Sequence, residues 1–418
     1  MKVCILTWEY PPRIVGGISR HCYSLANSLA KKGWNPTVVT LATPKRSLYV
    51  EEKGAKIVSI DPPHCSDFLT WTLLYNHMMA NTAILLHQKQ NFDLIHAHDW
   101  MTFVAGSIMK HALGIPMVVT FHSTERGRRG GIPSPFEKMI NDIEWLGSYE
   151  ASHVITVSNS LREELSSDLN VPANKISAIH NSMNLIRHVS KTINVRNNFA
   201  APNEKIVLFV GRLVWQKGVE SFIESCPFIL GQHPEAKIVI VGEGIMHDDL
   251  CRRISTLGIS SKVYVTGQMH DNMLNALYSC ADVLVVPSLY EPFGLTALEG
   301  MASGVPVVAS SVGGLNEIIT HERDGILVPA GNSKEIAGAV NRILSDSNLA
   351  GELSRNGRVR ARQFRSDKMV GETVKVYETV LGVSAKPSIV EIKEMINMEI
   401  KSSKSDEVKL VLDKKLVH

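Results

Sequence analysis

The sequence lacks the patterns that would assign it to several common functional classes. Its six cysteines include no C-x-x-C pair, so we expect reduced thiols rather than a disulfide framework or a zinc site. No apolar run approaches the roughly 18–20 residues that span a bilayer, and the short apolar start of the chain is typical of a first strand rather than a signal peptide. These absences predict a cytoplasmic protein, with peripheral contact to the inner face of the membrane left open.

Motifs for nucleotide cofactors and metals are missing too. There is no GxGxxG fingerprint and no GxxxxGK[ST] loop, which removes the main sequence support for hydride transfer and for a P-loop. Asp-x-Asp is also absent, so we expect no metal cofactor that bridges a diphosphate. A net charge of +3 over 418 residues gives no attraction on the scale that nucleic-acid binding needs.

The sequence does contain a regular alternation of short β-branched apolar runs and longer amphipathic segments, typical of parallel sheets with helices on both faces. The runs predicted to be strands are 2–8, 37–41, 56–60, 93–97, 117–121, 153–157, 175–179, 206–210, 237–241, 262–265, 283–287, 305–309 and 326–328. Helices are predicted between them, among others at 18–32, 67–88 and 102–112.

The polar, Asn-rich stretch 188–205 interrupts this alternation. We therefore predict an α/β protein with two doubly wound, Rossmann-like domains, at 1–190 and 191–365, facing an interdomain cleft. Residues 366–418 are predicted to form C-terminal helices that return to the first domain, followed by a charged tail. From Ser384 this tail is rich in Lys and Glu, which is typical of a solvated helix and leaves a partner-binding helix as the alternative.

Two of the predicted loops suit a phosphate group. Gly16 and Gly17 lie between the first strand and a helix, where adjacent glycines let the backbone approach an anion at a helix N-terminus. In "LFVGRLVWQKGVE", Arg212 and Lys217 follow another strand and combine a guanidinium fork with a point charge. Two solvated cations and an ordinary loop are the alternatives for each motif taken alone.

Two other loops carry histidines at strand ends. In "HAHDW", His96 and His98 are predicted to face the same side of a strand; they suit a sugar-binding rim or simple packing, and no third ligand cluster accompanies them for zinc. His122 comes just after a buried strand, in a position to face the cleft. The glycine-rich segment beyond it is predicted to be a mobile cationic loop, either solvated or binding an anionic acceptor or lipid phosphate. Its arginines are Arg126, Arg128 and Arg129.

Two glutamates stand eight residues apart in "SLYEPFGLTALEG". Pro292 places Glu291 in the loop after a strand, Gly294 permits close approach to a ligand, and a helix is predicted to begin near Leu295. Glu299 then falls in the first turns of this helix, where the positive end of the dipole would stabilise its carboxylate. A glycosidase also uses two carboxylates, but it has no need of the Arg/Lys pair on the neighbouring loop.

Taken together, Glu-x7-Glu, the "GRLVWQKG" segment and the "GG" after the first strand resemble the retaining glycosyltransferases of the GT-B fold. The resemblance is to the large family-4 group of glycogen, sucrose-phosphate and mannosyl transferases, and it spans about residues 2–382. "HAHDW" and "EYPPRIVGG" are most similar to glycogen and starch synthases, including archaeal ones.

The resemblance implies a role for each matching residue. Arg212 and Lys217 would hold the diphosphate of a UDP-, ADP- or GDP-sugar. Glu291 would bind hydroxyls of the donor sugar, and Glu299 those of the ribose. The remaining site residues implied are His122 for catalysis, Gly16, Gly17, Phe293, Gly294 and Leu295 for the donor, and Glu9, His98 and Asp99 on the acceptor side.

Two departures weaken the similarity to glycogen synthases without affecting the wider family. Ile14 and Val15 stand where those enzymes carry Lys-Thr, and "HNSMNL" replaces the frequent Asn-Gly-Val-Asp. The resemblance therefore implies transfer of a hexosyl unit, first of all glucose, to an acceptor hydroxyl, first of all that of an α-1,4-glucan. A lipid-phosphate or small-molecule acceptor is the alternative, and a non-catalytic nucleotide-sugar-binding module is a remote one. The nucleotide base and the oligomeric state are left open.

Overall fold

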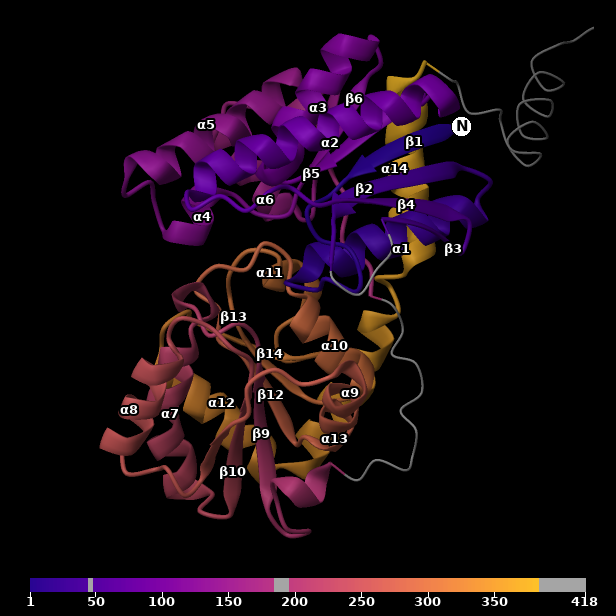
Figure 1. Cartoon of the computed structure of the whole chain (residues 1–418). Helices are drawn as coiled ribbons and strands as arrows, with labels where there is room; N and C mark the ends of the chain where they lie inside the picture. The colour runs from indigo at the N-terminus through magenta and orange to yellow at the C-terminus, as the bar shows by residue number, and fades with distance from the viewer. Residues whose placement is uncertain (44–47, 184–194, 383–418) are drawn as a thin grey trace, which may run out of the picture.

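The computed structural model describes residues 1–43, 48–183 and 195–382 (Figure 1). These residues form two α/β units, each built on its own sheet, which we call the N-terminal unit and the C-terminal unit. The predicted tail from Ser384, and the part of the interrupted stretch that precedes residue 195, lie outside the described residues. Among the residues that the structure describes, no helix is both long and apolar enough to cross a membrane.

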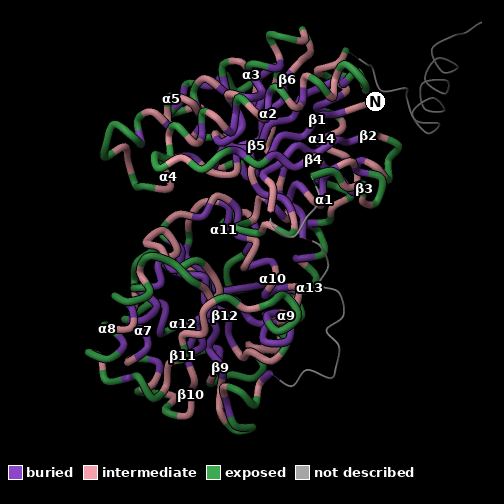
Figure 2. The backbone as a smooth tube through the Cα atoms, in the orientation of Figure 1, coloured by how far each residue is buried: buried purple, intermediate pink, exposed green. Residues whose placement is uncertain are grey.

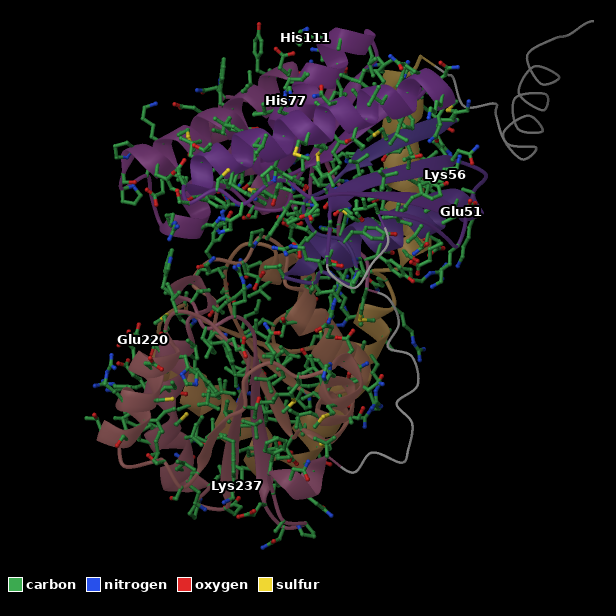
Figure 3. The ribbon with its side chains drawn as sticks, in the orientation of Figure 1. Glu51, Lys56, His77, His111, Glu220 and Lys237 are labelled. Atoms are coloured by element: carbon green, nitrogen blue, oxygen red, sulfur yellow. The ribbon has the colours of Figure 1, made fainter. Side chains whose placement is uncertain are left out.

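The N-terminal unit contains an eight-stranded sheet in the order β3-β4-β2-β1-β5-β6-β7-β8, parallel except for β3. Its strands are β1 (Lys2–Leu6), β2 (Asn35–Leu41), β3 (Tyr49–Glu52), β4 (Ala55–Ile60), β5 (Leu94–His98), β6 (Met117–Phe121), β7 (His153–Thr156) and β8 (Ile176–Ala178). Strand β3 was not predicted, because it is a short, half-exposed edge strand without an apolar run. Its Glu51 pairs in register with Lys56 of β4 (Figure 3), and charges of this kind discourage further strands from adding to an edge.

Helices cover both faces of this sheet. Along β1, Val3 and Ile5 pack in the core beneath α1 and α14, whereas Cys4 and Leu6 pack in the core shared with α2 and α3; this alternation follows from the two-residue repeat of a strand. The central strands are accordingly buried almost throughout, in contrast to the edge strand β3 (Figure 2). The helices are α1 (Gly17–Lys31), α2 (Phe68–Gln90), α3 (Trp100–Leu113), α4 (Glu125–Arg129), α5 (Pro135–Glu150), α6 (Asn159–Asp168) and α14 (Ser366–Val380).

The C-terminal unit has a six-stranded parallel sheet in the order β11-β10-β9-β12-β13-β14. The strands are β9 (Lys205–Val210), β10 (Ala236–Val241), β11 (Val263–Val265), β12 (Val283–Val286), β13 (Val307–Ser310) and β14 (Ile326–Val328). Its helices are α7 (Val219–Gln232), α8 (His247–Thr256), α9 (Asp271–Cys280), α10 (Leu295–Ser303), α11 (Leu315–Ile318), α12 (Ser333–Ser345) and α13 (Ser347–Ala361). Helices α7, α8 and α12 lie on one face and α9 and α10 on the other (Figure 1), while α13 packs against both α12 and α10.

The last helix of the described chain returns to the N-terminal unit. Helix α14 packs against α1, and its Tyr377 is fully buried. The Tyr377 ring lies 5.3 Å from that of Trp34, and its hydroxyl is 2.5 Å from Nδ1 of His96. The chain therefore passes between the two units twice, once after β8 and once after α13.

The strand order places the four loops predicted to carry the chemistry. In the first sheet the winding reverses between β1 and β5, and in the second between β9 and β12. Ligands of doubly wound sheets bind at such switch points, beyond the carboxyl ends of the strands. All the predicted strands have counterparts in the structure, and the prediction of two doubly wound Rossmann-like sheets is confirmed.

Candidate active site

A cleft of about 780 Å³ lies where the loops after β1, β5, β9 and β12 meet. Both units contribute to its wall. The predicted site residues that line it are Glu9, Gly16, Gly17, Asp99, His122, Arg212, Lys217, Glu291, Phe293, Gly294, Leu295 and Glu299. His98 is fully buried behind them and touches His122.

The N-termini of two helices from different units converge in this cleft. Glu9 accepts hydrogen bonds from the backbone N–H groups of Val15, at 2.7 Å, and Gly16, at 2.9 Å, which shapes the turn into α1. A Cβ on Gly17 would lie only 2.8 Å from Leu295 Cδ1, at the start of α10. Because helix N-termini present free N–H groups and positive partial charge, this junction is suited to an anion.

Lys217 reaches the loop after β12 because of the glycine that follows it. Gly218 has φ +62°, and a Cβ there would lie 1.8 Å from the carbonyl oxygen of Pro287. The turn can therefore lie directly against the end of β12. Lys217 Nζ donates to Glu291 Oε2 at 2.7 Å, and Ser288 Oγ lies 3.1 Å from the same oxygen. The predicted loop position of Glu291 and the helix start at Leu295 are both confirmed.

Glu299 is held from across the cleft by a residue that was not predicted. Its carboxylate pairs with Arg20 of α1, and the hydroxyl of Tyr278 donates to it at 3.1 Å. Arg20 also contacts Asp271 at 3.0 Å. Burial raises the pKa of Glu299, and Arg20 and Tyr278 oppose this rise. The predicted place of Glu299 in the first turns of a helix is confirmed, since it is the fifth residue of α10.

Known proteins identify the family of this chain. Residues 190–360 match the family model "Glycosyl transferases group 1", and residues 15–187 match "Glycosyltransferase Family 4". An uncharacterized glycosyltransferase of Methanocaldococcus jannaschii is 41% identical over 391 residues, covering 91% of this chain and 99% of that protein. The chain belongs to the glycosyltransferases.

Two further similarities concern particular members of the family. The glycogen synthase of Mycobacterium tuberculosis is 30% identical over 396 residues, covering 90% of this glycosyltransferase and 94% of that enzyme. The solved sucrose-phosphate synthase from Thermosynechococcus elongatus is 24% identical, with a TM-score of 0.79 over 92% of this chain and 100% of that one. The latter shows the GT-B fold alone.

The histidines of the glycosyltransferase form a larger cluster than predicted. His96 and His98 do face the same side, with ring centroids 4.2 Å apart, and His98 also belongs to a histidine group that was not predicted. Ring nitrogens of His21, His98 and His122 lie within 4.8 Å of one another, and His98 Nδ1 is 3.1 Å from His122 Nε2. Burial lowers the pKa of all three rings, that of His21 to about 4. They are therefore neutral at pH 7. His98 and His122 share one hydrogen bond, and among the described residues the buried Nε2 of His98 has no partner.

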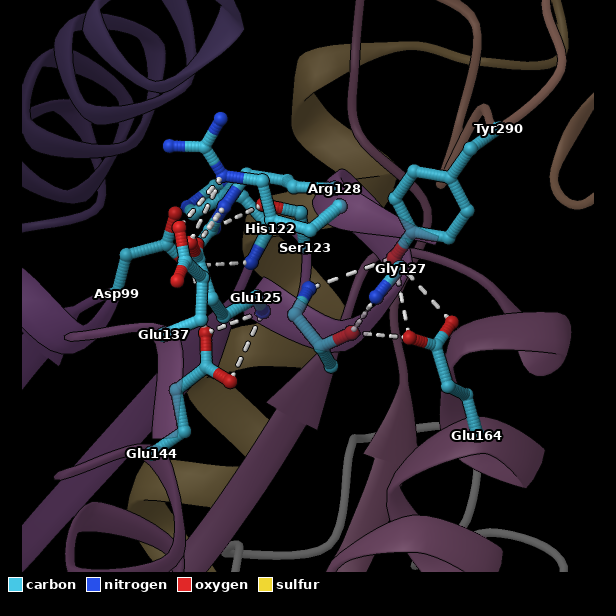
Figure 4. A network of polar contacts seen from close by, with 12 residues as sticks. Asp99, His122, Ser123, Glu125, Gly127, Arg128, Glu137, Glu144, Glu164 and Tyr290 are labelled. Atoms are coloured by element: carbon cyan, nitrogen blue, oxygen red, sulfur yellow. Dashed lines mark hydrogen bonds and ion pairs between the residues drawn. The ribbon is translucent and has the colours of Figure 1, made fainter. Parts of the chain in front are cut away.

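The predicted cationic loop is instead a short helix, α4, whose Arg128 lies among carboxylates (Figure 4). Arg128 donates to Glu125 at 2.9 Å and to Glu144 at 3.1 Å. Arg129 pairs with Glu125 at 3.2 Å, and Arg126 lies 3.5 Å from Asp168. The prediction of a loop is thus wrong for Glu125–Arg129, and acidic partners on α5 and α6 join the local partner Glu125 in pairing with its arginines.

Helix α4 also contacts the C-terminal unit, through the side chain of Tyr290. Its hydroxyl is 3.3 Å from the backbone nitrogen of Thr124 and 3.2 Å from both carboxylate oxygens of Glu164 (Figure 4). Its ring lies so close to Gly127 that a Cβ there would be 2.1 Å from Cζ. Because Tyr290 precedes Glu291, this contact links the loop of the predicted sugar carboxylate to the opposite unit.

Sequence reasoning missed the residues whose partners lie across the cleft. Arg20 stands one turn into α1 from the two glycines, and that spacing is the signal that could have placed it on the same helix face. Tyr290 had no signal beyond its neighbour Glu291. A group of aromatic residues also lines the cleft without having been predicted, namely Trp8, Phe68, Trp71 and Trp100.

Proposed function

We propose that this glycosyltransferase moves a hexosyl unit, glucose in the first instance, from a nucleoside-diphosphate sugar to an acceptor hydroxyl, with retention of anomeric configuration. The preferred acceptor is an α-1,4-glucan. One observation carries the proposal: Arg212 and Lys217, Glu291 and Glu299, and the N-termini of α1 and α10 line a single cleft between the units. This set matches the parts of such a donor, which has a diphosphate between two hydroxyl-bearing rings.

The roles of the donor-binding residues follow from their chemistry. Arg212 and Lys217 would hold the diphosphate, assisted by the N–H groups at the start of α1 and α10. Glu291 would accept hydrogen bonds from hydroxyls of the transferred sugar, and Glu299 would accept them from the ribose hydroxyls. The Lys217–Glu291 contact of 2.7 Å keeps the phosphate-binding cation beside the sugar-binding carboxylate. The donor requires this proximity, because its sugar and its phosphate are directly bonded.

The proposed reaction breaks the bond between the anomeric carbon and the phosphate oxygen. The acceptor hydroxyl approaches from the same face through an oxocarbenium-like state, and its proton passes to the departing phosphate oxygen. Fixed positive groups that face the developing negative charge lower the barrier, and Arg212 and Lys217 supply them. We therefore propose that no metal ion is required.

Two observations support a glucan as the acceptor: the function of one relative, and the ion pairs of the arginines in α4. The 30% identical M. tuberculosis relative is a glycogen synthase, which supports a glucan. The lipid-phosphate alternative rested on free cations in the segment of Arg126, and the arginines there are ion-paired. No contact of the described residues now favours it.

A hydrolysis screen tests the donor. UDP-, ADP- and GDP-glucose, with the matching mannose donors, are incubated with the protein without acceptor, and release of nucleoside diphosphate is followed. We expect one base and one sugar to be strongly preferred, and addition of maltoheptaose to accelerate release and give longer chains. Absence of turnover with every donor, with and without maltoheptaose, would overturn the proposal; binding without turnover would indicate the non-catalytic module.

A further inference from the structure

Four aromatic rings of the N-terminal unit form a continuous surface at the edge of the cleft. They belong to Phe68, Trp71, Trp100 and Phe136, and we call them the aromatic shelf. The Phe68 ring lies 6.0 Å from Trp71 at an interplanar angle of 17°, 6.3 Å from Trp100 and 6.1 Å from Phe136. Phe68 is thus at the centre of the shelf.

The shelf is built on the beginnings of three helices that pack side by side, α2, α3 and α5 (Figure 1). Phe68 and Trp100 are the first residues of α2 and α3, and Phe136 is the second residue of α5. Asp67 caps α2 through the N–H of Thr70 at 2.7 Å, and Ser134 caps α5. Capped helix starts hold these rings on rigid backbone.

The rings are supported from below and open from above. Trp71 stacks at 5.4 Å and 3° on Tyr75, which is fully buried. Phe68, in contrast, is 50% exposed and Phe136 37%. Phe68, Trp71 and Trp100 line the same cleft as His122 and Lys217, so the shelf continues the proposed reaction site outward.

The charges beside the shelf favour a neutral ligand. In α4, Arg126, Arg128 and Arg129 are ion-paired with carboxylates. The guanidinium of Arg13, which lines the same cleft, lies over the Trp8 ring, 5.3 Å from its centroid. An anionic lipid surface or a phosphate group is attracted by unpaired Lys and Arg, and α4 supplies none. Pyranose rings match the shelf better, because their axial C–H groups form apolar faces that pack on aromatic rings while their hydroxyls stay hydrated or hydrogen-bonded.

We propose that the aromatic shelf is a stacking subsite for the acceptor, which binds the sugar rings of a neutral glucan beyond the unit whose hydroxyl reacts. The inference rests on the proposed function. Large, rigid aromatic side chains lose little conformational entropy on binding, so the shelf would contribute affinity for chains longer than the reacting unit. It predicts a dependence on acceptor length that the donor-binding residues cannot produce.

The test compares Phe68→Ala with Phe68→Trp and with the control Tyr149→Ala. Tyr149 is an aromatic residue of α5, 65% exposed and stacked on Trp145 at 5.3 Å, outside the cleft lining. Initial rates are measured with the donor found in the hydrolysis screen and with maltose to maltoheptaose. Binding of maltoheptaose is followed by tryptophan fluorescence in the presence of the nucleoside diphosphate.

We expect Phe68→Ala to raise the KM for maltoheptaose about 3- to 10-fold, with a smaller rise for maltose. The KM for the acceptor should rise more than that for the donor, Phe68→Trp should restore it, and Tyr149→Ala should leave both KM values as in the wild type. An equal rise for every acceptor length, or for both alanine variants, would overturn the subsite.

Other outcomes separate this inference from the proposed function. Donor hydrolysis without any binding of maltoheptaose would overturn the shelf while the glycosyltransferase activity stands. Failure of donor hydrolysis itself would count against the proposed function instead. Sedimentation with phosphatidylglycerol vesicles that depends on Phe68 would overturn the glucan in favour of a membrane surface.

Discussion

At the scale of single residues, the position of Lys217 shows how a glycine can place a functional cation. Only a residue without a Cβ fits at position 218, because the carbonyl oxygen of Pro287 occupies the space where that atom would be. The backbone also has a positive φ there, which costs a glycine little. The ammonium group of Lys217 can therefore stand 2.7 Å from Glu291 of the adjacent loop.

Replacing this cation tests its role directly. We expect Lys217→Ala to lower kcat by about 100-fold or more, since loss of one group that stabilises a developing charge costs about 3–4 kcal/mol of the barrier. The fold should persist, as Lys217 is partly exposed. The measurement is kcat with the preferred donor, accompanied by circular dichroism. Lys138→Ala, which removes a lysine exposed on α5, is the matched control; near wild-type turnover of the Lys217 variant would refute the assignment.

At the scale of elements, α11 of the C-terminal unit caps α6 of the N-terminal unit. The Glu317 carboxylate accepts the backbone N–H groups of Asn159 at 3.0 Å and Ser160 at 2.9 Å, the first residues of α6, and lies 2.7 Å from Nε2 of His180. Burial alone would raise the pKa of Glu317, but these hydrogen bonds outweigh it and lower the pKa to about 2. The contact thus stabilises the folded arrangement of the two units while Glu317 is ionised.

The pH dependence of this cap has a defined sign. Because the folded pKa lies below the unfolded one, the stabilisation is complete above about pH 4.5 and is lost as the pH falls toward 2. We expect Glu317→Gln to lower the free energy of unfolding at pH 7 by about 1–3 kcal/mol, and the difference from wild type to shrink below pH 4.5. Urea midpoints at pH 7 and pH 4 measure it. Glu322→Gln, in an exposed pair with Arg342, should change them little; a difference independent of pH would contradict the explanation.

The elements themselves were largely predictable, and their pairing across space was not. The buried strands follow from short runs of apolar residues. The helix start near Leu295 follows from Pro292 and Gly294 just before it. Contacts such as Arg20 with Glu299, and Arg128 with Glu144, join residues far apart in sequence, so no local pattern encodes them. The four loops could be named because strand ends are local features, and one interdomain cleft was expected from the doubly wound pattern and the resemblance.

At the scale of the whole molecule, Arg20 connects the units through the carboxylate proposed to bind ribose. Burial raises the pKa of Glu299 and Arg20 opposes this rise, so Arg20→Met should raise that pKa further. A larger fraction of Glu299 would then be protonated as the pH falls, and a protonated carboxyl accepts fewer hydroxyl hydrogen bonds. We expect the donor KM of the variant to rise more at pH 6 than at pH 8.

Donor KM values from pH 6 to pH 8 test this prediction. Asp271→Asn is the control, because it removes the other, exposed partner of Arg20 and leaves the contact with Glu299 in place. A rise in KM that is the same at both pH values would show that Arg20 acts only by holding the units together.

The positive groups at the proposed diphosphate site predict the activity of the enzyme without metal. Arg212, Lys217 and two helix N-termini supply positive charge to the proposed diphosphate site. Turnover should therefore persist in excess EDTA and should not increase when Mg²⁺ or Mn²⁺ is added. Initial rates in the three conditions decide the matter, and complete loss of activity in EDTA, reversed by added metal, would refute the prediction.

The return of α14 to the N-terminal unit has a mechanical consequence. A body attached to another at one point can swing and twist in any direction, whereas attachment at two points leaves mainly a rotation about the line that joins them. The chain crosses between the units after β8 and again after α13, so this molecule has two attachments. If the cleft opens to exchange ligands, the N-termini of α1 and α10, at Gly17 and Leu295, should move apart by one rotation. Each closure should then bring them back to the same relative position.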